Sequence, residues 1–149
     1  TLVSLFPDVE PACITSVITH VLRAPDLYKL NPQTKEQEAG FRINELTGTL
    51  EVNTSKHRTY KTLESVTTPL HIYFGILSAH ISTRSAIVYF FRYLTHLNKL
   101  AAEYEWAAVH EYHTLFFNRR LAEMSSGDYS RWGEPDLFLM ASHVVPHRR

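Results

Sequence analysis

Apolar positions recur at helical spacing along most of the second half of the chain. Residues 85–103 carry them at i, i+3 and i+4, and this spacing predicts a long helix. A second helix follows after a break near Tyr104 and reaches about Met124. A third helix begins at Thr68-Pro69, with Thr as its cap and Pro at its first position, and is apolar nearly all round. Such a helix belongs in the centre of a bundle.

Two shorter helical segments and a loop complete this pattern. The first helix runs from about Val9 to Arg23, with Asp8 as its cap. Residues 125–134 are rich in Ser, Gly and charged side chains and predict a loop. A last short helix opens at Pro135. The segments together predict helices that must pack on one another.

The stretch 41–52 has a different, two-residue pattern. With Thr47 and Gly48 in a turn, one register places apolar side chains on one face and an ion pair on the other. This pattern predicts a small β-hairpin, which is too short to stand alone and is expected to lie against helices. The positions paired in this register are Phe41–Val52, Arg42–Glu51 and Ile43–Leu50.

The predicted fold class is therefore mainly α: a bundle of five to six helices with one small inserted β-hairpin at about 41–52. A chain of 149 residues has the size of one domain, here 1–149. It opens at Thr1 without a Met, so we expect a domain excised from a longer polypeptide. The single Cys13 excludes an internal disulfide framework and favours a reducing, intracellular compartment, cytoplasmic or nuclear.

Nine histidines raise the question of a metal site. His110 and His113 flank Glu111, but the spacing is one residue short of His-Glu-x-x-His, and no third ligand has matching spacing. Cys13 lies in an apolar periodic segment, which is typical of an inert thiol. We therefore expect no catalytic centre, no metal and no cofactor, with a His-based metalloenzyme as a distant alternative. If His96 or His113 is buried and neutral, assembly or stability should fall below about pH 6.

The helix over 85–103 carries a second, tyrosine-rich stripe beside its predicted core stripe. The core stripe consists of Ile87, Phe90, Phe91, Leu94, Leu97 and Ala101. One apolar stripe suffices to bury a helix, so the second indicates a protein interface, where the ring packs and the hydroxyl stays hydrated. A helix buried on both faces would explain it equally well. The predicted interface residues are Tyr89, Tyr93 and Leu100, and the predicted core residues of the next helix are Trp106, His113 and Phe116.

Binding of single-stranded RNA or DNA is the alternative function. Arginines interleaved with aromatic side chains can neutralise and stack a nucleic-acid strand. Against it, fifteen Lys+Arg balance fifteen Asp+Glu, so no basic footprint stands out. The candidate nucleic-acid residues are Arg92, Arg119, Arg120, Arg148 and Arg149.

Four segments carry a family resemblance: FRINELTGTLEV, YKTLESVTTPLHIYFGILSAH, FFRYLTHLNKLAAEYEWAAVHEYHTLFFNRR and GDYSRWGEPDLFLMASHVVPHR. The clearest piece is Trp106-x-x-Val109-x-x-Tyr112-His113-x-x-Phe116, which consists of packing residues. These segments, which span most of the chain, resemble the Gag-like proteins encoded by fungal retroelements. The resemblance implies a structural module that self-associates or packages element RNA, although Cys-x-x-Cys-x-x-x-x-His knuckles are absent from the sequence.

The leading hypothesis from the sequence is a non-enzymatic interaction domain of a retroelement-derived, Gag-like and capsid-like protein. It acts by self-association, so its expected partner is a second copy or another protein, with RNA as the alternative. No membrane partner is expected, because no apolar stretch approaches the roughly 20 residues that span a bilayer.

Overall fold

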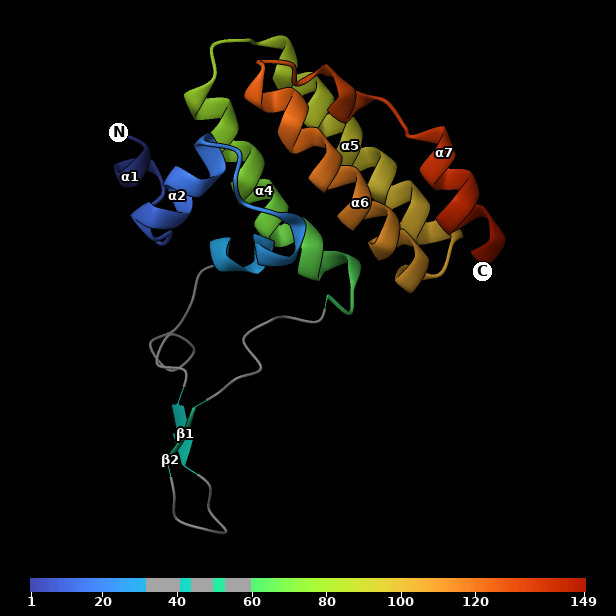
Figure 1. Cartoon of the computed structure of the whole chain (residues 1–149), viewed down its shortest axis with the longest axis horizontal. Coiled ribbons are helices and arrows are strands. Elements are labelled where there is room, and N and C mark those ends of the chain that lie inside the picture. Colours follow the sequence, from blue (N-terminus) through green and yellow to red (C-terminus); the bar gives the residue numbers. More distant parts are fainter. Residues whose placement is uncertain (32–40, 44–49, 53–59) are drawn as a thin grey trace.

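The computed structural model describes residues 1–31, 41–43, 50–52 and 60–149, and it is mainly α-helical, as the hydrophobic pattern predicted. Three long helices dominate the fold (Figure 1): α4 (Leu63–His80), α5 (Ser85–Glu103) and α6 (Trp106–Ser125). Short helices flank them: α1 (Leu2–Leu5), α2 (Pro11–Ile18) and α7 (Leu137–Leu139). The remaining turns are the 3-10 segments η1 (Ala24–Leu30), η2 (Ser130–Gly133) and η4 (Val145–His147), and the π-helical turn η3 (Met140–Val144).

The sequence placed the long helices α5 and α6 correctly, but it placed the start of α4 too late. Helix α4 begins at Leu63 because Thr62 and Ser65 form a reciprocal cap, in which the Thr62 hydroxyl accepts the Ser65 N–H at 3.2 Å. Pro69, expected at the helix start, lies inside the helix and is buried. It lacks the N–H of that position, so α4 loses one backbone hydrogen bond there.

The first predicted helix, by contrast, is shorter than expected. Helix α2 ends at Ile18, and its N-cap is Glu10 rather than Asp8. His20 adopts a φ of 61°, a left-handed conformation that cannot continue a right-handed helix. The chain therefore turns into η1, which packs on α4 and α6.

Two short strands, β1 (Phe41–Ile43) and β2 (Leu50–Val52), pair in an antiparallel ladder. Phe41 faces Val52, Arg42 faces Glu51 and Ile43 faces Leu50, which is the register written from the sequence. The turn between them lies outside the described residues, so the complete hairpin stays a prediction. The packing of these strands on the helices likewise stays a prediction.

The centre of the bundle is a cluster of aromatic rings around Trp132. This tryptophan comes from η2, and its ring lies 5.0 Å from the rings of both Phe74 and Tyr93 and 5.5 Å from that of Phe117. Gly133 lets η2 approach α5, because a Cβ at this position would lie 2.8 Å from Cδ1 of Tyr89. A segment expected to be a loop therefore supplies the middle of the core.

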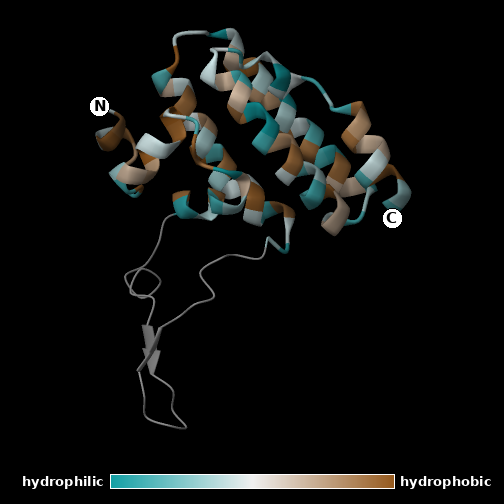
Figure 2. Ribbon diagram, viewed as in Figure 1, coloured by the Kyte–Doolittle hydropathy of each residue, from teal (hydrophilic) through white to brown (hydrophobic). Residues whose placement is uncertain are grey.

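Hydropathy follows this packing along the ribbon (Figure 2). Hydrophobic and hydrophilic positions alternate along α5 and α6, as expected of helices with one face against the core and one face outward. Among the described helices none has both the length and the apolar character needed to cross a bilayer.

Candidate protein-interaction surface on helix α5

Two of the three residues predicted to form an interface are in the core instead. Tyr93 is only 1% exposed, and Leu100 is buried as well. Tyr89 is half-buried, with its ring against Gly133 of η2. The prediction was wrong because α4, α6 and η2 all pack on α5, so this helix is covered on more than one side.

The Tyr93 hydroxyl is satisfied inside the core by a histidine. Its oxygen lies 2.6 Å from Nδ1 of His113, which is itself 1% exposed. Burial lowers the pKa of His113 to about 3, so the imidazole is neutral in the folded protein, and the nearby His110 contributes in the same direction. This buried pair stabilises the fold through a hydrogen bond and presents no surface.

The predicted core residues of α6 divide into two kinds. His113 and Phe116 are buried in the aromatic cluster. Trp106 is half-buried at the start of α6, where its indole N–H donates to the Tyr60 carbonyl at 2.7 Å. The central tryptophan of the fold is thus Trp132, whereas Trp106 lies at the edge.

The residues considered for metal or nucleophilic chemistry do not converge. His110 lies beside the rings of Tyr60 and Trp106. Burial raises the pKa of the half-buried Cys13 thiol, which favours the less reactive protonated form. Within residues 1–31, 41–43, 50–52 and 60–149, no group of three or more His, Cys, Asp or Glu side chains is placed to hold a metal ion.

The five candidate nucleic-acid arginines do not form one basic patch. Arg120 is buried, with its guanidinium 2.9 Å from Glu123 and over the ring of Phe116. Arg119 pairs with Asp136 at 3.0 Å. Arg148 and Arg149 lie at the C-terminal end of α5. Arg148 forms an isolated antiparallel β-bridge with Tyr104. The Arg149 guanidinium donates to the Ala101 carbonyl, and the Arg149 backbone N–H donates to the Glu103 carbonyl. Of the five, Arg92 alone lies in the surface groove described next.

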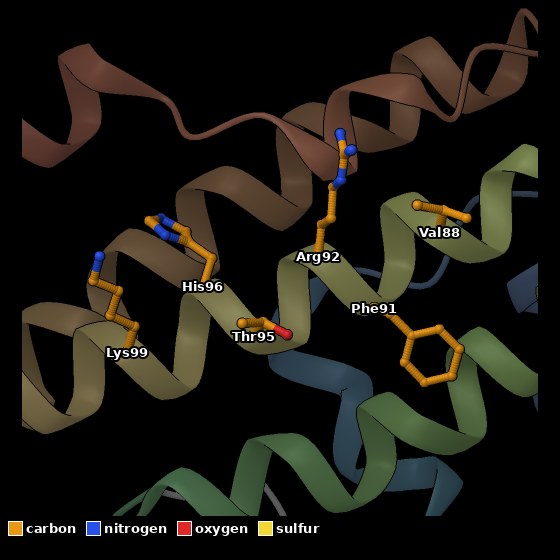
Figure 3. A pocket seen from close by; sticks show the side chains of 6 residues that line it. All are labelled: Val88, Phe91, Arg92, Thr95, His96 and Lys99. Atoms are coloured by element: carbon orange, nitrogen blue, oxygen red, sulfur yellow. The ribbon is translucent and has the colours of Figure 1, made fainter.

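The outward face of α5 carries a shallow groove of about 430 Å³, which we call the α5 groove. Figure 3 shows its six lining side chains following one another along the helix, with Phe91 directed toward α4 and Arg92 toward the C-terminal segment. The lining residues are Val88, Phe91, Arg92, Thr95, His96 and Lys99. The groove therefore has an apolar end at Val88 and Phe91 and a basic end at Lys99.

Phe91 is the most exposed of the large apolar residues of this face. This residue is 62% exposed, beside the exposed Val88 and Ile87. It also lines a second hollow, of about 280 Å³, between α4 and α5, with Ile87, Phe74 and Leu94. Adjoining exposed apolar side chains around a hollow are typical of a surface that binds another protein.

The charged side chains that line the α5 groove are all basic. Arg92 and Lys99 line it, no carboxylate does, and neither cation forms an ion pair with another described residue. Burial and the neighbouring Lys99 lower the pKa of His96, so this imidazole is neutral near pH 7. A partner for this groove needs apolar side chains flanked by acidic ones.

Sequence reasoning missed this face because it assigned Phe91 to the core stripe. No local signal separates the two rings of such a tandem: Phe116 and Phe117 of α6 are both buried, whereas Phe91 of the pair Phe90-Phe91 is exposed. Phe90 is buried and stacks on Phe74 at 4.5 Å, which leaves Phe91 outside. No family model, curated protein or solved structure matches this chain.

Proposed function

We propose that this domain is a non-enzymatic interaction module that acts by self-association through the exposed face of α5. The observation that carries the proposal is the 62% exposed Phe91 at the apolar end of the α5 groove. A phenylalanine ring left in water forgoes about 1.5–3 kcal/mol of burial, which a second copy can recover. The Gag-like origin suggested by the sequence remains a proposal of the same kind.

The nucleic-acid alternative has less support. An electrostatic binder needs several cations on one surface, because affinity grows with the number of phosphates neutralised. Arg120 is buried beside Glu123, and Arg119 is paired with Asp136. The exposed Arg92 and Lys99 flank an apolar groove instead, which fits a protein partner better than a phosphate backbone.

The test is the molar mass of the full chain in solution, measured by light scattering for the unmodified protein and two variants. Phe91→Glu places a charge in the α5 groove at a position that is 62% exposed. Val21→Glu is the matched control, because Val21 is 64% exposed on the segment between α2 and η1 and lines neither the α5 groove nor the hollow between α4 and α5.

Self-association through α5 predicts an unmodified protein heavier than the 17.2 kDa monomer, with Phe91→Glu monomeric and Val21→Glu unchanged. The mass should persist in high salt, because apolar contacts are screened little. A monomer at every concentration would refute self-association. Equal masses for all three proteins above 17.2 kDa would place the interface elsewhere.

A further inference from the structure

A second exposed apolar site lies at the start of α7. Leu137 is 77% exposed and Phe138 is 70% exposed, and we call this pair the C-terminal knob. The next residue, Leu139, is buried, so the short helix is anchored on one side and presents two large apolar side chains on the other.

The C-terminal knob is held rigidly by Asp136. The carboxylate of Asp136 accepts the Leu139 N–H at 3.0 Å and pairs with Arg119 at 3.0 Å, while its own N–H donates to the Tyr112 hydroxyl at 3.1 Å. The backbone that carries the two exposed side chains is thus ordered before a partner arrives, which lowers the entropy cost of binding. The same bonds hold the buried Leu139 in the core.

The charges beside the C-terminal knob complement those of the α5 groove. Glu134, three residues before Leu137, is exposed and forms no ion pair with another described residue. Asp136 is already matched by Arg119, so the uncompensated charge on this side is negative. The α5 groove has the opposite sign, with unpaired Arg92 and Lys99 and no carboxylate in its lining.

A short chain of contacts connects the two sites. The Tyr112 hydroxyl, which accepts from the Asp136 N–H, lies 3.4 Å from Nε2 of His96, a residue of the α5 groove. Knob and groove are therefore neighbours on one chain. Two copies facing each other across a two-fold axis can each place a knob against the other's groove, which is the closed arrangement most common in homodimers.

We propose that the occupant of the α5 groove is the C-terminal knob of a second copy, so that the domain forms a reciprocal two-fold dimer. Leu137 and Phe138 cover Val88 and Phe91 in each of two equivalent contacts, and Glu134 lies toward the basic end of the partner's groove. This inference rests on the proposed self-association and specifies which surfaces meet.

The test is a mixing experiment with full-length variants, each checked for unchanged helix content and thermal midpoint. Phe91→Glu disrupts the apolar end of the α5 groove and leaves the C-terminal knob unchanged. Phe138→Glu disrupts the C-terminal knob and leaves the α5 groove unchanged. Each variant alone lacks both contacts, so its dissociation constant should rise at least about tenfold. A one-to-one mixture retains one intact knob-to-groove contact and should be heavier than either variant alone by sedimentation equilibrium.

The outcomes separate this inference from the proposal on which it rests. If Phe138→Glu remains as dimeric as the unmodified protein while Phe91→Glu is monomeric, α5 self-associates but the knob is not its occupant. If both variants are monomeric and their mixture is also monomeric, the two sites do not meet each other, and the inference fails. A monomeric unmodified protein at every concentration would refute self-association itself.

Discussion

Acidification should destabilise the fold through the buried imidazole of His113. This side chain is 1% exposed and shares a 2.6 Å hydrogen bond with the Tyr93 hydroxyl, so a proton on the ring would place a charge in the aromatic core. Burial lowers the pKa of His113 to about 3 in the folded protein. The unfolded chain keeps the ordinary histidine value of about 6.5. The unfolded state therefore binds more protons between these values, and the free energy of unfolding falls as the pH falls.

The size of the effect follows from these two pKa values. At pH 7 nearly all folded molecules and about three quarters of unfolded ones are deprotonated at His113, so the cost is only about 0.2 kcal/mol. At pH 5 the unfolded state has taken up its proton and the folded state has not, which removes about 2 kcal/mol of stability. Burial also lowers the pKa of His20, His96 and His110, so these groups act in the same direction.

The assay is urea unfolding followed by tryptophan fluorescence at pH 7 and pH 5, because Trp132 is buried only in the folded state. The control is His113→Gln, whose amide can bond the Tyr93 hydroxyl but does not titrate. Both proteins should carry Phe91→Glu to keep dimerisation out of the measurement. The drop between pH 7 and pH 5 should shrink by about 2 kcal/mol in His113→Gln. Equal drops with and without His113 would refute the reasoning.

Two paired substitutions test the core by denaturant unfolding. Tyr93→Phe orphans the buried Nδ1 of His113 and should cost about 1–3 kcal/mol, whereas Tyr73→Phe should cost little, because the buried Tyr73 hydroxyl has no hydrogen-bond partner among the described residues. Trp132→Ala should cost about 3–5 kcal/mol, and the half-buried Trp106 should cost clearly less when changed to Ala. A large loss for Tyr73→Phe, or equal losses for the two tryptophans, would contradict this description of the core.

The sequence was most informative where one local signal dominates. The spacing over 85–103 predicted the bounds of α5, since the pattern is long and continuous. It failed at Thr68-Pro69, where a strong start signal competes with the earlier reciprocal cap of Thr62 and Ser65. Both are valid local signals, and only the packing of the first turn of α4 decides between them.

The location of the interaction surface depended on tertiary packing that periodicity does not contain. The sequence offered two stripes on α5, and which one is buried depends on how many neighbours cover the helix. The packing of η2 on α5 determines that the tyrosine stripe is buried: Trp132 fills the core beside Tyr93, and Gly133 covers Tyr89. Because the segment 125–134 has the composition of a loop, nothing local marks Trp132 as a core residue.

The most direct test of the proposed interface is a dilution series of the unmodified, ¹⁵N-labelled chain, followed through its backbone amide NMR signals. Self-association through knob and groove predicts concentration-dependent shifts along the α5 groove, at Val88, Phe91 and Thr95, and at the C-terminal knob, while Val21 stays constant. Signals that do not change with concentration, or changes confined to the neighbourhood of Val21, would contradict an interface on α5.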